Sequence, residues 1–72
     1  MNDLYLNVTL HYKGYDSKIF FSIEDKLYYG KIEEIPDLVN WECEFGNLAD
    51  LYSAFAEAVE DYLSFIRDLL AE

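Results

Sequence analysis

The chain has 72 residues, of which 53% are hydrophobic, and its five Lys and Arg against fifteen Asp and Glu give a net charge of −10 at pH 7. The high apolar content excludes intrinsic disorder, and the negative charge argues against binding nucleic acid over a broad face, because phosphates would be repelled. An acidic chain instead suits a basic partner.

The length predicts one domain over residues 1–72, and a domain this small buries only about 60% of the surface of its unfolded chain. Cys43 is the single cysteine, so no disulfide within the chain can compensate. Seven Tyr, five Phe and one Trp supply large buried areas instead. The core is therefore expected to be dense in aromatic residues or to be shared with another subunit.

No targeting or membrane-spanning segment is evident. The sequence starts Met1-Asn2-Asp3-Leu4, without the basic segment and apolar run of a secretory signal. No stretch approaches the roughly 20 apolar residues of a membrane span. We expect a cytoplasmic protein that does not bind membranes.

The first half of the chain has the period-two pattern of β-strands. Leu4, Leu6, Val8 and Leu10 alternate with polar or aromatic residues, which predicts a strand with the leucines on its buried face. After the turn signal Lys13–Ser17, Ile19, Phe21 and Ile23 alternate with Lys18, Phe20 and Ser22, which predicts a second strand and a hairpin.

Two further strands are expected. A third runs from Leu27 to Ile35, and its Gly30 permits a bulge or the close approach of another backbone. Pro36-Asp37 ends it, Leu38 to Trp41 forms a short fourth strand or an extended edge, and Glu42 to Asn47 is a loop.

From Leu48 onward the apolar residues follow the period of a helix. They are Leu48, Leu51, Tyr52, Phe55, Val59, Tyr62, Leu63, Ile66, Leu69 and Leu70. Asn47 is the expected N-cap, and a helix from Leu48 to Leu70 would be about 34 Å long. Because a small sheet cannot cover that length, the last turns are expected to contact something beyond it. The predicted class is α+β: a small antiparallel sheet of three to four strands with one long C-terminal helix packed on one face.

The opposite side of this helix carries an acidic stripe. Asp50, Glu57, Asp61 and Asp68 are spaced seven, four and seven residues apart, so they share one narrow face, with Glu60 beside them. A solvated helix face is the simpler interpretation. However, Arg67 is the only base on the helix, and unrelieved like charge is mildly destabilising. The stripe is therefore a candidate docking surface for a basic protein.

Several aromatic residues fall on strand positions expected to face away from the helix: Tyr5, Phe20, Tyr28 and Trp41. Such a face is either an interface or a cluster that packs on itself. We expect Tyr28 to join the acidic stripe in partner binding. Tyr5 and Phe20, with Ile66 and Leu70 of the helix, are expected at an interface between copies of the chain.

Catalytic and metal-binding patterns are weak. His11 is the only histidine and lies far in sequence from Cys43, and the adjacent pair Glu33-Glu34 would face opposite ways on a strand. No phosphate-binding loop or nucleophile motif is present. We expect no enzyme activity, no catalytic residue, no metal and no cofactor.

One ordered series of residues is more specific than the composition. It comprises Tyr12-Lys13-Gly14-Tyr15, Ile19, Phe21-Ser22, Glu24-Asp25, Tyr28-Tyr29-Gly30-Lys31-Ile32, Ile35, Asp37-Leu38-Val39, Ala54-Phe55 and Ala58-Val59-Glu60-Asp61-Tyr62-Leu63. This series resembles the HicB family of antitoxins from prokaryotic toxin-antitoxin systems, over about Tyr12 to Phe65. The resemblance implies a partial ribonuclease H-like fold, assembly as a dimer or larger oligomer, and the binding and masking of a small basic HicA toxin that cuts messenger RNA.

The chain departs from the family pattern at Ser17 and Glu34, where glycine is usual, and at Glu42-Cys43, where Glu-Gly is usual. It also stops at Glu72, where relatives often continue into a DNA-binding segment, so direct DNA binding is not expected. Two other functions are considered: an acidic protein of a mobile element that blocks another nucleic-acid-binding protein, and, least favoured, a ribonuclease H-like nuclease.

Overall fold

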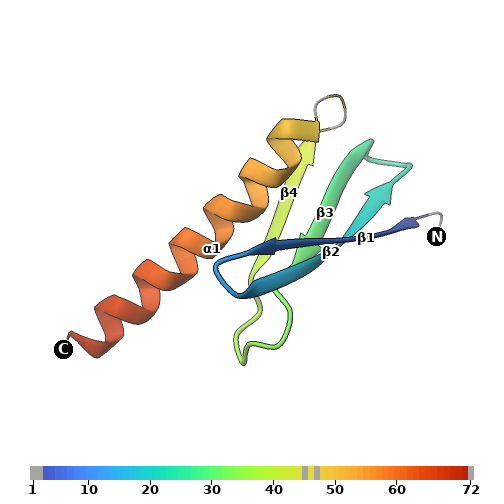
Figure 1. The fold of residues 1–72 in the computed structure, drawn as a ribbon. Helices are drawn as coiled ribbons and strands as arrows, with labels where there is room; N and C mark the ends of the chain where they lie inside the picture. Colours follow the sequence, from blue (N-terminus) through green and yellow to red (C-terminus); the bar gives the residue numbers. More distant parts are fainter. Residues whose placement is uncertain (1–2, 45, 47, 72) are drawn as a thin grey trace.

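The computed structural model describes residues 3–44, 46 and 48–71, in which a four-stranded antiparallel sheet is followed by one helix (Figure 1). The elements are β1 (Leu4–Tyr12), β2 (Tyr15–Ser22), β3 (Leu27–Lys31), β4 (Asn40–Glu44) and α1 (Leu48–Leu70). The α+β class and the bounds of the helix agree with the prediction. The expected N-cap, Asn47, lies outside the described residues.

The strands follow one another in space as they do in sequence, in the order β1-β2-β3-β4. Lys13 and Gly14 both have positive φ, 51° and 83°, and join β1 to β2 in the two-residue turn that suits the twist of a hairpin. Ser22 pairs with Leu27 across the β2–β3 turn, where the Lys26 N–H donates to the Ser22 carbonyl at 2.7 Å. The hairpin predicted for the first two strands is confirmed.

The third and fourth strands differ from the prediction. β3 ends at Lys31 rather than Ile35, because the chain turns at Glu34, whose φ is 61°. The Glu33 N–H leaves the sheet pattern and donates to the Asp16 carbonyl at 2.8 Å. β4 then begins later than expected and includes Glu42 to Glu44, for which the sequence predicts a loop.

The helix packs on one face of the sheet, mainly over β4, and its last turns extend beyond it (Figure 1). The core consists of Ile19, Ile32, Trp41, Leu51, Phe55, Val59 and Tyr62. Past this core the helix exposes large apolar side chains, and Leu70 is 82% exposed. The expectation that the helix is longer than its sheet is confirmed.

The predicted buried face of the first strand is wrong over most of its length. Leu4, Leu6 and Val8 are 49%, 37% and 49% exposed, and only Leu10 packs against the core. The register shifts between Tyr5 and Thr9, where Asn7 has a φ of 58°, which interrupts the alternation of the strand. The first half of β1 also lies far from α1, so the helix does not cover these three side chains (Figure 1).

Gly30 makes room for a buried hydrogen bond that ties β4 to β2. The indole Nε1–H of Trp41 donates to Ser17 Oγ at 2.7 Å, and both residues are buried. A Cβ on Gly30 would lie 2.4 Å from the Lys18 carbonyl oxygen, 2.6 Å from Ser17 Oγ and 2.8 Å from Trp41 Nε1. The close approach predicted for Gly30 is confirmed.

Phe55→Ala should strongly destabilise the fold. Phe55 is fully buried, with its ring centroid 6.3 Å from that of Trp41. Truncating a buried Phe costs about 3 to 5 kcal/mol, which is comparable to the whole stability of a small domain. Urea denaturation followed by circular dichroism measures this cost. Phe65→Ala, at a half-exposed position of the same helix, is the matched control, and equal costs for the two variants would contradict the packing described.

Gly30→Ala should lower the free energy of unfolding by about 3 kcal/mol or more, because the added Cβ cannot be placed without moving the Lys18 backbone. Gly14→Ala is the control: its φ of 83° is unfavourable for alanine, but no atom lies within 4 Å of the added Cβ. That strain is expected to cost about 1 kcal/mol. Thermal melting of the two variants compares them, and a smaller loss at Gly30 than at Gly14 would be inconsistent with the Trp41 contact.

Candidate partner-binding surface

The acidic stripe of the helix is exposed, as its spacing predicts. Asp50, Glu57, Asp61 and Asp68 all lie on the solvent side of α1. Among the described residues, none of these four carboxylates takes part in an ion pair. We call these four residues the acidic stripe. Their charge is not balanced within the described part of the chain, so it is available to an external cation.

Glu60, which the sequence pattern places beside the stripe, has a different environment. Tyr12 Oη donates to Glu60 Oε2 at 2.6 Å, and Lys13 Nζ lies 2.7 Å from the same oxygen. The Lys13 ammonium and the Tyr12 hydroxyl hold the pKa of the Glu60 carboxyl below its usual range, and the hydrogen bond to Glu60 raises the pKa of Tyr12. Glu60 therefore joins α1 to the β1–β2 turn, and its charge is already compensated.

Aromatic side chains form a row on the open face of the sheet, the face opposite α1. The rings of Tyr5 and Phe20 have centroids 5.4 Å apart, and those of Phe20 and Tyr29 are 5.5 Å apart and nearly parallel. Tyr5 and Phe20 thus lie where the alternation placed them. The rings pack on one another, as expected for a cluster that packs on itself. Tyr5 nevertheless remains 49% exposed, as expected for an interface.

Tyr28 and Trp41 were predicted on the open face, and this is wrong. Tyr28 lies opposite Phe21, with ring centroids 5.2 Å apart, on the side of the sheet that α1 covers, and Trp41 is part of the core. The pairing of Ser22 with Leu27 sets the register so that Tyr29, not Tyr28, is opposite Phe20. Sequence reasoning missed Tyr29, which the length of the β2–β3 turn could have indicated.

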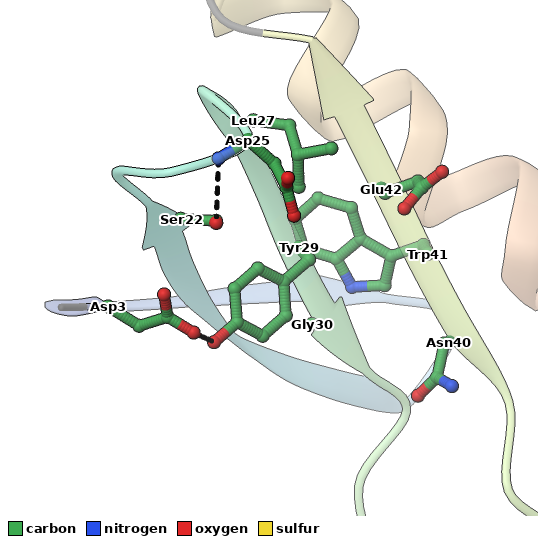
Figure 2. A pocket seen from close by; sticks show the side chains of 9 residues that line it. All are labelled: Asp3, Ser22, Asp25, Leu27, Tyr29, Gly30, Asn40, Trp41 and Glu42. Carbon is green, nitrogen blue, oxygen red and sulfur yellow. Dashed lines mark hydrogen bonds between the residues drawn. The ribbon is translucent and has the colours of Figure 1, made fainter. Parts of the chain in front are cut away.

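A hollow of about 690 Å³ lies beside Tyr29 (Figure 2). It is lined by Asp3, Ser22, Asp25, Leu27, Tyr29, Gly30, Asn40, Trp41 and Glu42. Tyr29 Oη donates to Asp3 Oδ2, which raises the pKa of Tyr29, and the Asp25 N–H donates to Ser22 Oγ at 3.2 Å. Asp3, Asp25 and Glu42 contribute carboxylates to this hollow, and no described basic side chain lines it, so this part of the open face is negative as well.

The residues expected at an interface between copies do not form one surface. Tyr5 and Phe20 lie on the open face, whereas Ile66 and Leu70 belong to the helix on the other side of the sheet. Ile66 packs against the core, and Leu70 is exposed beyond it. A single contact cannot use all four residues, and their role in assembly stays a prediction.

Metal-binding and nucleophilic groups are dispersed. No group of three or more His, Cys, Asp or Glu side chains in residues 3–44, 46 and 48–71 could hold a metal ion. His11 Nδ1 contacts Asp16 Oδ1 at the exposed end of the β1–β2 hairpin. Burial raises the pKa of the Cys43 thiol, which favours the protonated, unreactive form.

Comparisons with protein-family models, with curated proteins and with solved structures found no match for this chain. In the part of the chain that the structure describes, no helix has the length and hydrophobicity needed to cross a bilayer. The function is therefore inferred from the surface itself.

The stability contributed by Glu60 should depend on pH. Its folded-state pKa lies below the ordinary value of 4.5, so its ion pair stabilises the fold above that pH, and this contribution is lost as the pH falls through the lower, folded-state pKa. Glu60→Gln should thus lower the free energy of unfolding at neutral pH and have no effect in strong acid.

Urea denaturation of both proteins at the two pH values gives this difference. Glu57→Gln, on the same helix and without an ion pair, is the matched control. The ion pair is not the source of the stability difference if the free energies of unfolding of wild type and Glu60→Gln differ as much in acid as at neutral pH.

Proposed function

We propose that this protein is an antitoxin-like inhibitor that binds and masks a small basic HicA-type toxin, a ribonuclease that cuts messenger RNA. The observation that carries the proposal is the acidic stripe, four exposed carboxylates on one rigid helix with no compensating base among the described residues. An enzyme that acts on RNA attracts phosphates with a positive surface, and a row of carboxylates competes for that surface.

The geometry of the helix suits this role. From Asp50 to Asp68 the stripe extends over about 27 Å, which is long enough to cover the active site of a small protein. The residues are held by a helix whose other side is packed into the core, so little conformational entropy is lost when they meet a partner.

Two further features support the proposal. The net charge of −10 favours rapid encounter with a basic protein. The sheet with a helix across one face is also the kind of arrangement that the resemblance to HicB antitoxins implies. A mobile-element protein that blocks another nucleic-acid-binding protein would use the same stripe, and the identity of the captured partner distinguishes the two functions.

Co-expression provides the direct test. The neighbouring reading frame is expected to encode a short basic protein with a histidine in its active site. Expression of that protein alone should stop growth, and co-expression of the present chain should restore it, with the two proteins copurifying. If growth inhibition persists and nothing copurifies, the antitoxin proposal is wrong.

A triple variant that combines Glu57→Gln, Asp61→Asn and Asp68→Asn tests the stripe itself. It removes three charges at exposed positions, and each substitution should change the folding stability by no more than about 0.5 kcal/mol. Exposed charges act chiefly through the encounter, so association with the toxin should slow and its dependence on salt should weaken. Stopped-flow association rates at two ionic strengths measure both effects.

A control variant removes the same charge from elsewhere. Glu24→Gln, Glu33→Gln and Glu34→Gln combined change three carboxylates in loops that flank β3, away from the helix. This variant should retain most of the association rate. Equal slowing by the two triple variants would indicate that net charge alone, not the stripe, attracts the partner.

A further inference from the structure

One edge of the sheet is open and regular. β4 pairs with β3 on one side, and no described strand pairs with its other side. Half of the backbone N–H and C=O groups of such an edge strand point away from the sheet and can pair with an added strand. β4 is in continuous register with β3 over all five of its residues, so this edge is straight enough to act as a template.

The opposite edge of the sheet is different. β1 carries the register shift between Tyr5 and Thr9 and the positive φ of Asn7, and such irregularities commonly prevent an edge strand from pairing with another chain. β4 has no irregularity of this kind and contains neither proline nor lysine. Its exposed charges are the carboxylates of Glu42 and Glu44, which would repel an acidic strand and attract a basic one. Of the two edges, β4 is the one that can accept a strand.

A groove of about 240 Å³ runs along this edge, between α1 and β4. Its lining residues are Val39, Asn40, Trp41, Glu42, Ala54, Glu57, Ala58 and Asp61. Ala54 and Ala58 are small, and this leaves space between the helix and the strand. No residue of β3 lines the groove, so it opens on the outer side of β4.

The charges around the groove determine what fits there. Glu57 and Asp61 border it from the helix, and Glu42 and Glu44 are exposed on β4. None of these carboxylates has an ion pair among the described residues, and no basic residue lines the groove. Side chains of an added strand would alternate between the helix side and the open face. Lysine or arginine at either set of positions would therefore meet carboxylates.

We propose that the outer edge of β4 accepts a basic β-strand of the partner protein, which extends the sheet while its cationic side chains pair with Glu57 and Asp61 or with Glu42 and Glu44. The inference rests on the proposed function, because it names the surface by which the inhibitor holds its basic target. Strand addition supplies affinity through main-chain hydrogen bonds and specificity through alternate side chains. A second copy of the chain is a poor occupant, because pairing two β4 strands would bring like charges together.

Hydrogen exchange tests the proposal without the toxin. The probe is a synthetic peptide of alternating lysine and valine with capped ends, added to the ¹⁵N-labelled full chain. The β4 amides that point away from β3 should exchange at least tenfold more slowly when the peptide is bound. The same peptide with alternate backbone nitrogens methylated, and a peptide of alternating glutamate and valine, should give no protection.

Charge reversals on the helix locate the contact. Glu57→Lys combined with Asp61→Lys should weaken peptide binding about tenfold or more, whereas Asp68→Lys, exposed on the same helix but outside the groove, should change it about twofold at most. Protection confined to β1, equal binding of the methylated peptide, or equal loss in Asp68→Lys would each overturn the proposal. Protection of the outward β4 amides in the free protein, with dimers seen by sedimentation, would assign the edge to a second copy and would also overturn it.

The two proposals can fail separately. If the chain neutralises the toxin but β4 amides stay unprotected in the complex and with the peptide, the antitoxin function holds and strand addition is wrong. If the peptide protects β4 but no toxin is neutralised, the docking edge stands and the proposed target is wrong.

Discussion

The absence of a side chain at Gly30 is the constraint on which the rest of the structure depends. Gly30 sits opposite Trp41 in the β3–β4 register, and its bare Cα leaves the space in which the indole reaches Ser17 on β2. Phe55 then packs against that indole, which fixes α1 over β4. One glycine thus couples the register of the sheet to the position of the helix, and through it to the acidic stripe and the groove.

The sequence predicts best where one pattern decides the structure. The 3.6-residue period alone defined α1, because its apolar side is buried over three consecutive turns at Leu51, Phe55 and Val59. The exposed positions of the stripe followed from the same period. The turn signal Lys13–Ser17 placed the first hairpin for an equally local reason. The structure makes this turn with Lys13 and Gly14 alone, which both adopt positive φ, and β2 already begins at Tyr15.

The remaining errors concern choices that local patterns cannot make. The alternating pattern predicts that Leu4, Leu6 and Val8 share a face. It does not predict that a register shift and the limited extent of the helix leave these side chains exposed. Tyr28 and Tyr29 are adjacent aromatic residues, so a register change of one residue exchanges their faces, and only the pairing across the turn decides between them. Trp41 is buried because a distant glycine accommodates it, which no neighbouring residue reveals.

The carboxylates of the helix divide between two tasks according to the side they occupy. Glu60 faces the β1–β2 turn, where Tyr12 and Lys13 compensate its charge. Glu57 and Asp61 lie on the side of the helix that borders β4 and have no such partner among the described residues. The chain has few bases, and Lys13 is placed where it links two elements. The uncompensated charge of the helix is thereby concentrated on one of its sides, among the described residues.

This concentration of charge connects stability to binding. Like charges along one helix and the adjacent strand oppose folding slightly, and a domain with a core of seven buried apolar residues has little stability in reserve. A basic partner that binds only the folded chain relieves the repulsion and shifts the folding equilibrium towards that state. If the proposed basic partner binds these carboxylates, the charge that weakens the free protein would stabilise the complex, which is a property that the proposed inhibitor requires.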